Sequence, residues 1–412
     1  MARVLLLIPT TSYRVSDFLT AAHRLGVEVA VASDRRQVLE KYSKGRTVTV
    51  DFSNHGRGVQ QIAEYARKSP LAAIVPVDEE TILLAAEASN ALGLPHNSIA
   101  SVEAAHNKYR FRTLLAEAGF PSPRFELLSI RHDPNRAAGR AIYPCVLKPL
   151  ALSASRGVIR ANDPEAFVDA FHRIVQILNQ TQRAGDGSSA DHILVEGYIP
   201  GVEVALEGLL DGGRLNVLAV FDKPDPLEGP FFEETIYVTP SRLSDGTQET
   251  IAATVAEAVA VLGLSDGPIH AELRINDRGA WIVEIAARSI GGLCARILRF
   301  GAGIGLEELI LRHALQLPIA AMERERRAAG VMMIPIPRAG ILRSVDGLEK
   351  ARSVAGVHDV TISIPLGHEV IPLPEGYRYL GFIFAKGNNP GIVEDTLREA
   401  HRRLAFGIEP AQ

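Results

Sequence analysis

Two glutamates, Glu272 and Glu284, stand inside two apolar runs of the segment IHAELRINDRGAWIVEIAARSIGG, residues 269–292. The polar residues between the runs, 276–279, are typical of a tight turn, so the segment predicts a β-hairpin. Two facing carboxylates repel each other unless a positive group lies between them. A Mg²⁺ ion is one such group, because it prefers carboxylate oxygens together with substrate phosphates. A surface hairpin with Glu–Arg pairs is the alternative.

The register of the hairpin follows from the length of its turn. A three-residue loop ending in glycine predicts three opposed pairs, Asn276 with Ala280, Arg274 with Ile282 and Glu272 with Glu284. Because strand side chains alternate between faces, the expected core face consists of Ile269, Ala271, Leu273, Ile275, Trp281, Val283 and Ile285. The other face is expected to hold His270, Glu272, Arg274 and Glu284, with Arg288 just beyond the second strand.

A second group of residues has the types that bind phosphate. Lys148 ends the apolar run YPCVLKP, and the loop ALSASRG follows it, with two hydroxyls, Arg156 and Gly157. Backbone N–H groups, small side chains and a lysine charge can surround an anion. Downstream, VEGYIPGVE adds Glu196 at a strand end and Glu203 one short turn later. Taken singly, each of these residues could equally be a surface position.

The composition restricts the class of protein. The chain has 412 residues, 47% of them hydrophobic, and a net charge of −4, which gives no electrostatic reason to expect nucleic acid or an anionic membrane as a partner. The two cysteines, Cys145 and Cys294, argue against a disulfide framework and favour a cytoplasmic location. No apolar stretch is long enough to span a bilayer, and the run before Pro9 predicts a buried strand rather than a signal peptide.

The expected elements change in kind along the chain. The first hundred residues alternate strand and helix signals, which predicts a parallel sheet covered by helices. The turn PTTSYR after the first strand has no glycine, so no nicotinamide cofactor is expected. A helix is expected within 107–119, a linker-like loop at 183–191 and a solvated helix over the charge run AMERERRAAG, 321–330. Strands and a last helix, about 392–404, end the chain.

The order of these motifs resembles the ATP-grasp superfamily over roughly residues 1–320. The matching succession is Lys108, Lys148 with its loop, Glu196 to Glu203, then Glu272, Glu284 and Arg288. The resemblance implies an α/β fold, α+β in its nucleotide-binding part, with an amino-terminal parallel-sheet domain and a small carboxy-terminal α+β region. The implied divisions are 1–105 (amino-terminal domain), 106–195 (small subdomain with the phosphate loop), 196–320 (large subdomain with the metal site) and 321–412.

The resemblance also implies a role for each matching position in binding ATP and Mg²⁺. Lys108 and Lys148 would hold the phosphates, and a loop would close over them with Ser153, Ser155, Arg156 and Gly157. At the hinge, the adenine would meet Glu196, Tyr198 and Ile199, while Glu203 would accept from the ribose. Glu272 and Glu284 would bind Mg²⁺, although Ala286 stands where many members have a ligand asparagine.

Within the superfamily, the segment FDKPDPLEGPFFEETIYVTPS, 221–241, looks like carboxylate–amine ligases of the L-amino-acid ligase and carnosine-synthase type. There Glu233 or Glu234 would receive a substrate ammonium, and Lys223 is a further candidate contact. Arg288 would act in catalysis with Lys148, facing the carboxyl substrate and its acyl phosphate. Gly291 and Gly292 would leave room for the substrate side chain, or they would only serve a turn.

The resulting hypothesis is an ATP-dependent ligase that forms an amide through an acyl phosphate, with an amino acid as a substrate and a homodimer as a possible assembly. One alternative is a biotin-carboxylase-like or purine-pathway enzyme that activates another acid. A second alternative, suggested by Ala286, is a nucleotide-binding protein without catalysis. ATP turnover separates the last alternative from both enzymes.

Overall fold

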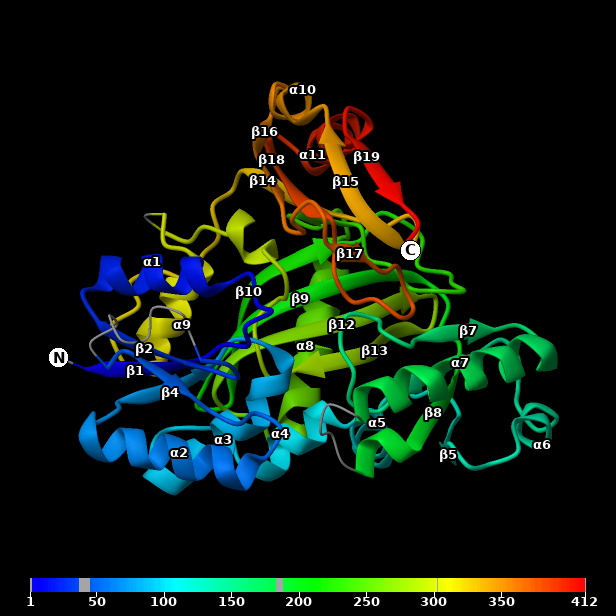
Figure 1. The fold of residues 1–412 in the computed structure, drawn as a ribbon, viewed down its shortest axis with the longest axis horizontal. Helices are drawn as coiled ribbons and strands as arrows, with labels where there is room; N and C mark the ends of the chain where they lie inside the picture. The colour runs from blue at the N-terminus through cyan, green and yellow to red at the C-terminus, as the bar shows by residue number, and fades with distance from the viewer. Residues whose placement is uncertain (1, 37–44, 183–187, 302, 412) are drawn as a thin grey trace.

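The computed structural model describes residues 2–36, 45–182, 188–301 and 303–411, and the chain begins with a parallel sheet (Figure 1). The strands, in the spatial order β3-β2-β1-β4, are β1 (Arg3–Leu7), β2 (Glu28–Ser33), β3 (Thr47–Thr49) and β4 (Ala73–Pro76). The helices are α1 (Val15–Leu25), α2 (His55–Lys68), α3 (Ile82–Leu92) and α4 (Ile99–His106). The predicted α/β fold class with an amino-terminal parallel sheet is therefore confirmed.

The next part of the chain forms a small antiparallel sheet in the order β5-β8-β6-β7. Its strands are β5 (Phe125–Ser129), β6 (Cys145–Pro149), β7 (Ile159–Ala161) and β8 (His192–Gly197), and its helices are α5 (Lys108–Glu117), α6 (Pro134–Ala138) and α7 (Pro164–Gln182). Helix α7 packs its buried Phe167 and Phe171 against this sheet. Of the loop predicted at 183–191, residues 183–187 lie outside the described residues, and 188–191 form a 3-10 turn.

A large sheet dominates the middle of the molecule and runs in the order β13-β12-β9-β10-β11-β14-β18-β16 (Figure 1). Its strands before residue 300 are β9 (Val202–Asp211), β10 (Arg214–Asp222), β11 (Ile236–Thr239), β12 (Gly267–Asn276) and β13 (Gly279–Ala286), with α8 (Asp245–Leu262) and α9 (Leu306–Ala314) beside them. The later strands are β14 (Ala328–Ile334), β16 (Val357–Ile362) and β18 (Gly381–Gly387). One sheet thus continues past residue 320, and the proposed divisions at 105, 195 and 320 stay predictions.

A three-stranded sheet closes the carboxy-terminal region in the order β17-β15-β19. Its strands are β15 (Gly340–Asp346), β17 (Glu369–Val370) and β19 (Ala405–Glu409), and α10 (Leu348–Arg352) and α11 (Pro390–Arg402) belong to the same region. The solvated helix predicted over 321–330 is wrong, because β14 already begins at Ala328 and the residues before it are not helical. Pairing of Ala328 and Ala329 with β18 outweighs the helical preference of the charged residues.

The β12–β13 hairpin has the predicted pair of Glu272 and Glu284 but reaches it by a different path. Its turn is one residue shorter than expected, since Asn276 pairs with Gly279 rather than Ala280. A bulge at Val283 then restores the pairing of the two glutamates. Between the turn and the bulge, the side chains of β13 lie on the face opposite to the predicted one. The core residues there are Ala280 and Ile282 instead of Trp281 and Val283. Arg274 accordingly faces Trp281, not Ile282.

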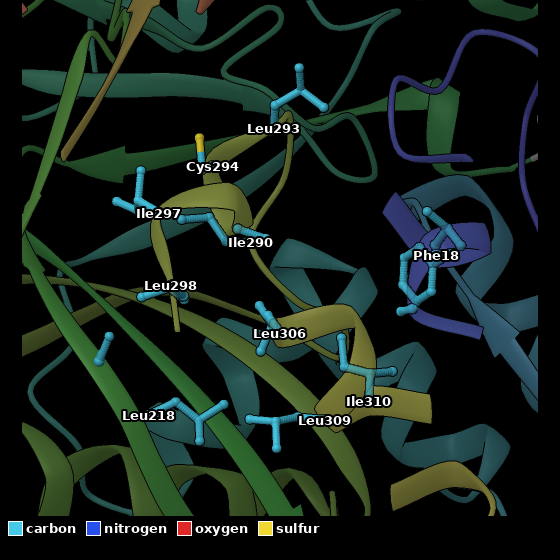
Figure 2. Close-up of a cluster of buried hydrophobic side chains, with 14 of the residues drawn as sticks. Phe18, Leu218, Ile290, Leu293, Cys294, Ile297, Leu298, Leu306, Leu309 and Ile310 are labelled. Carbon is cyan, nitrogen blue, oxygen red and sulfur yellow. The ribbon is translucent and has the colours of Figure 1, made fainter. Parts of the chain in front are cut away.

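A shared apolar core joins the amino-terminal sheet to the segment that follows β13. Figure 2 shows Phe18 of α1, Leu218 of β10 and the buried leucines and isoleucines of residues 290–310 in one cluster. Ile290 and Leu293 are 2% and 4% exposed, so the backbone just after Arg288 is anchored in this core. None of the helices in the described ranges has the length and apolarity needed to cross a membrane.

Candidate active site

Lys223, which directly follows β10, lies buried among three carboxylates. Its Nζ donates to Glu203 Oε1 at 2.8 Å and to Glu272 Oε1 at 3.0 Å, and it also donates to Glu234. Burial lowers the pKa of Lys223, but the carboxylates raise it well above the ordinary value. Burial raises the pKa of Glu234 to about 7 in spite of the ammonium. We call these four residues the Lys223 cluster, in which one ammonium donates hydrogen bonds to three carboxylates.

His270 connects this cluster to the segment that carries Arg288. Its Nδ1 is 3.1 Å from Glu207 Oε2, and its Nε2 is 3.7 Å from Glu272 Oε1. Burial lowers the pKa of His270, but the two carboxylates raise it to about 9. The buried Glu207 also accepts a hydrogen bond from the backbone N–H of Ile290 at 3.0 Å. The strand that holds Glu272 is therefore tied to the backbone two residues after Arg288.

The carboxylates of the Lys223 cluster have the chemistry of a site for a hard cation. One oxygen from each of Glu203, Glu234 and Glu272 lies within 4.8 Å of the others, and such oxygens are the donors that Mg²⁺ prefers. Glu284, which pairs with Glu272 across the hairpin, is not one of these three, and its carboxylate lies 3.4 Å from Lys108 Nζ. Ala286 is 4% exposed and contributes no ligand oxygen. The donor set thus fits Mg²⁺, while the ligand roles of Glu272 and Glu284 stay predictions.

A second buried cluster, here called the Glu196 cluster, has the opposite composition. Glu196 at the end of β8 accepts from Arg112 Nε at 2.9 Å and lies 2.6 Å from Lys148 Nζ on β6. Burial would raise the pKa of Glu196, but the two cations hold it at about 2. Burial lowers the pKa of Lys148. Two cations thus share one carboxylate, which leaves positive charge for an anion such as a phosphate.

Arg112 is a member of this cluster that the sequence analysis missed. From helix α5 it also donates to the backbone oxygens of Ile282, at 2.9 Å, and Val283, at 3.3 Å. Those carbonyls belong to the edge strand β13, at its bulge. Arg112 therefore links the small sheet to the hairpin. An arginine on a helix is ordinary in sequence, so only the tertiary contacts distinguish it.

The predicted hinge residues are held together by Arg274. Its NH1 donates to the hydroxyl of Tyr198 at 2.9 Å and to the carbonyl of Ile199 at 3.0 Å. Its Nε donates to Glu203 Oε2 at 3.0 Å, so Arg274 also binds the Lys223 cluster. The sequence placed Arg274 on the polar face of the hairpin but gave it no role. The structure thus brings Tyr198, Ile199 and Glu203 together around one guanidinium.

Arg288 pairs with a residue of the amino-terminal domain that the sequence analysis missed. Its Nε donates to Glu79 Oε2 at 2.7 Å, and His106 Nδ1 lies 3.1 Å from the other oxygen of Glu79. Burial would raise the pKa of Glu79, but Arg288 and His106 hold it at about 2. Glu79 comes just after β4, whose carboxyl end is a usual place for site residues in parallel sheets. That signal was available in the sequence.

The predicted phosphate loop, 153–157, follows β6 and is close to Lys108. Lys108 Nζ donates to the carbonyl of Leu152 at 2.9 Å, directly before the loop. Ser155 has φ of 54° and Gly157 has φ of 71°, so the loop bends sharply through the left-handed region. A side chain at Gly157 would lie 2.8 Å from Pro149, and only glycine fits there. The loop therefore lies beside Lys108, with Ser153, Ser155 and Arg156 on it.

The residues predicted to bind substrate separate into pairs with different environments. Glu234 belongs to the Lys223 cluster. Glu233 lies next to a different group: burial raises its pKa, and a hydrogen bond with the backbone of Ile336 lowers it. Gly291 has open space where a side chain would begin. Gly292 has φ of 59°, and a Cβ there would lie 2.9 Å from the ring of Phe382. Of the two glycines, Gly291 is adjacent to free space and Gly292 is required by the turn.

Comparisons with known proteins give matches along most of the chain. Three family models match: an ATP-grasp N-terminal domain over residues 19–96, an ATP-grasp domain over 141–297 and an L-amino acid ligase C-terminal domain 2 over 332–409. The second of these ranges holds Lys148, the phosphate loop and both hairpin glutamates. The third runs from within β14 to the end of β19.

Two of the named curated relatives match most of the chain. An alanine–anticapsin ligase of Bacillus subtilis is 25% identical over 317 residues, which is 71% of this chain and 66% of that ligase. Dapdiamide A synthase of Enterobacter agglomerans is 24% identical over 356 residues, which is 84% of this chain and 82% of that synthase. Both similarities are distant, but they extend well beyond a single motif.

Solved structures agree with the sequence comparisons. The crystal structure of an L-amino acid ligase from Bacillus licheniformis superimposes with a TM-score of 0.84 at 25% identity, and 99% of each chain is covered. A carboxyaminoimidazole ribonucleotide synthase of Aspergillus clavatus, complexed with ATP, has a TM-score of 0.71 at 16% identity over 98% of this chain and 99% of that one. The second likeness concerns the fold alone.

Proposed function

The chain belongs to the ATP-grasp superfamily, and from that premise we propose that it is an ATP-dependent ligase joining the carboxylate of one amino acid to an amine. The relatives support this proposal, because they include a ligase named for alanine and anticapsin, a dapdiamide synthase and an L-amino acid ligase. The amide would form through an acyl phosphate, with ADP and phosphate released.

One observation carries the proposal: Glu272 and Glu284 face each other on β12 and β13, and each faces a different charged group. Glu272 lies in the Lys223 cluster, which has an excess of carboxylates. Glu284 lies beside Lys108, close to the phosphate loop. A polyphosphate with a divalent cation would need such an arrangement of opposite charges.

In the proposed complex the phosphates of ATP would lie against Lys108, Lys148 and the loop 153–157. The adenine would lie at the hinge, near Glu196, Tyr198 and Ile199, with Glu203 toward the ribose. Bound Mg²⁺ would neutralise charge on the phosphates, held by Glu272 and Glu284 with the neighbouring carboxylates.

The proposed reaction begins when a carboxylate oxygen of the donor amino acid attacks the γ-phosphorus of ATP and ADP leaves. Glu234 would receive the donor's ammonium, and Arg288 would orient its carboxylate, since guanidinium binds carboxylate through two parallel hydrogen bonds. Glu233 and Gly291 would lie near the donor side chain. The amine then attacks the acyl carbon, its proton is lost, and phosphate leaves to give the amide.

Positioning and charge neutralisation would supply most of the rate enhancement, because phosphoryl transfer leaves little covalent work to the protein. Lys148 and Arg288 would stabilise the negative charge that develops on the transferred group and on the acyl oxygen. The loop 153–157 would keep water away from the acyl phosphate. A cytoplasmic homodimer is part of the proposal, and size-exclusion chromatography tests the dimer.

The test is a screen of ADP release with Mg²⁺ and pairs of amino acids, followed by mass spectrometry of the products. The proposal expects ADP and an amide of the two amino acids in equal amounts. ADP release that responds to bicarbonate and to no pair of amino acids would support the carboxylase alternative instead. An intact protein that binds ATP without any turnover would support the non-catalytic alternative.

A further inference from the structure

The phosphate loop packs against a segment far along the chain, residues 372–377, here called the latch segment. The backbone N–H of Gly157 donates to the carbonyl of Pro374 at 2.9 Å. Arg156 Nε donates to the carbonyl of Glu375 at 2.9 Å, and its guanidinium lies 5.4 Å from the centre of the Tyr377 ring. In Figure 1 the chain after β17 descends from the carboxy-terminal region toward β7 and α7.

The side chain of Glu375 holds a second element of the small sheet. Arg173 on α7 donates to it through two nitrogens, with NH2 2.9 Å from Glu375 Oε2. Such a paired contact fixes direction as well as distance. Arg173 itself lies 4.9 Å from the centre of the Phe231 ring. Glu375 therefore binds the loop through its carbonyl and the helix behind the loop through its carboxylate.

The loop needs support because its backbone is unusual. Ala154 and Ser155 both have φ of 54°, in the left-handed region that side chains other than glycine seldom adopt. At one end the loop is fixed by Lys108, which donates to the carbonyl of Leu152. At the other end the contacts come from the latch segment. The shape of the loop thus depends on residues of the carboxy-terminal region.

We infer that Glu375 is a positioning residue of the ligase, which holds the phosphate loop in the orientation that covers the ATP phosphates. The inference rests on the proposed function for what the loop covers, whereas the docking of the loop stands on its own contacts. Without this hold, water reaches the acyl phosphate and attacks its phosphorus or its carbonyl carbon. Either attack gives free carboxylate and phosphate, so ATP is consumed without amide formation.

If Glu375 only stabilised the fold, its loss would lower the unfolding temperature of the whole chain. Its side chain is 33% exposed and that of Arg173 is 42% exposed, and ion pairs so open to solvent contribute little to the stability of a whole chain. Loss of the pair should therefore leave the unfolding temperature nearly unchanged. Its effect should appear in the loop and in the fate of the acyl phosphate.

The activity test uses Glu375→Gln, which keeps the backbone carbonyl and removes only the charge. We expect the KM for ATP to rise about twofold to fivefold, as loss of an exposed ion pair implies, with little change in kcat for ADP release. The ratio of ADP to amide should exceed the wild-type ratio. Glu369→Gln, an exposed glutamate on β17, is the matched control and should behave as wild type.

A charge exchange sharpens this test. Glu375→Arg combined with Arg173→Glu reverses the pair and should restore most of the wild-type ratio of ADP to amide, whereas either change alone should not. Wild-type KM and wild-type coupling in Glu375→Gln would overturn the inference.

Hydrogen exchange of residues 150–160, measured with and without ADP, reports how well the amides of the loop are protected and needs no turnover. The Gly157 amide should exchange faster in Glu375→Gln than in the wild type or in Glu369→Gln. If the wild type makes no amide yet this difference is present, the proposed function fails and the docking of the loop stands. If the exchange is unchanged, the inference about Glu375 fails whatever the activity.

Discussion

The Lys223 cluster and the Glu196 cluster are both buried and both ionic, but their charges are unbalanced in opposite directions. In the first, one ammonium contacts three carboxylates. In the second, one carboxylate contacts a guanidinium and an ammonium. Burial makes an uncompensated charge costly, so each cluster is better satisfied when an ion of the missing sign is bound.

The protonation equilibria follow the same contrast. Burial and the neighbouring carboxylates raise the pKa of Glu234 to about 7, which marks an excess of negative charge. Burial and the neighbouring cations lower the pKa of Lys148, although Glu196 opposes them. A cation would relieve the first cluster and a polyphosphate the second. The imbalance between the clusters therefore indicates the ligand of each.

The largest effect is expected from Glu284→Gln, because Glu284 pairs with Glu272 of the Lys223 cluster across the hairpin and its carboxylate contacts Lys108, which is beside the phosphate loop. Turnover should fall about 10²- to 10³-fold, the usual result of removing one group that stabilises a transition state. The fold should survive, since the side chain is 27% exposed. ADP release and circular dichroism measure the two effects. Wild-type turnover at limiting Mg²⁺ would contradict the metal role.

The next largest effect concerns acid stability and the Glu196 cluster. Because the folded pKa of Glu196 is about 2 and its ordinary value is 4.5, its stabilising contribution is complete above pH 4.5 and is lost as the pH falls toward 2. The shift corresponds to about 3 kcal/mol of unfolding free energy. Glu196→Gln should lose that stability at neutral pH and show a flatter decline below pH 4.5.

Urea unfolding at a series of pH values measures this contribution. Glu126→Gln, whose side chain is 57% exposed, is the matched control on the neighbouring strand β5 and should follow the wild-type curve. Glu79 adds a second contribution in the same pH window, since its pKa is also held at about 2. Equal acid profiles for wild type and Glu196→Gln would show that the cluster is not the source.

A smaller effect tests the negative cluster directly. Lys223→Met removes the one ammonium and leaves three carboxylates, so a divalent cation should bind more tightly to the variant than to the wild type. We expect Mg²⁺ to raise the unfolding free energy of the variant by about 1–3 kcal/mol at saturating concentration. Thermal unfolding with and without Mg²⁺ measures the difference. If Mg²⁺ stabilises both proteins equally, the carboxylates do not form a cation site.

The smallest effect distinguishes Gly291 from Gly292. Gly292→Ala should destabilise the protein by about 1 kcal/mol or more, because of its positive φ and the ring of Phe382. Gly291→Ala should stay within about 0.5 kcal/mol of the wild type. The Gly291→Ala variant should instead change the preference between donor amino acids with large and with small side chains. Equal destabilisation of the two variants would mean that Gly291 is also a turn residue.

Much of the fold could be predicted because the signals were local. Two features were predicted correctly from the sequence: the alternation of strands and helices before residue 100, and the pairing of Glu272 with Glu284. That pairing was reached through two errors that cancel, a turn one residue too long and a bulge that was not foreseen. A bulge at Val283 leaves no clear local pattern, so the faces of Trp281 and Val283 were predicted incorrectly.

The site was less predictable where it depends on distant contacts. Arg112 and Glu79 bind residues 84 and 209 positions away. The position of Glu79 just after β4 indicates a site residue but not its partner, and the sequence around Arg112 indicates neither. Glu375 lies outside every motif, because its role comes from a segment that folds back on the phosphate loop. Motifs identify the residues that touch ligands, whereas the partners that neutralise or hold them emerge from the tertiary structure.

The formation of an acyl phosphate is tested most directly by isotope transfer. The donor amino acid is supplied with ¹⁸O in its carboxylate, and the phosphate released during amide formation is analysed by mass spectrometry. The proposed reaction predicts one ¹⁸O atom in phosphate for every amide formed, since the attacking oxygen leaves with the phosphoryl group. Unlabelled phosphate released in step with amide formation would contradict it.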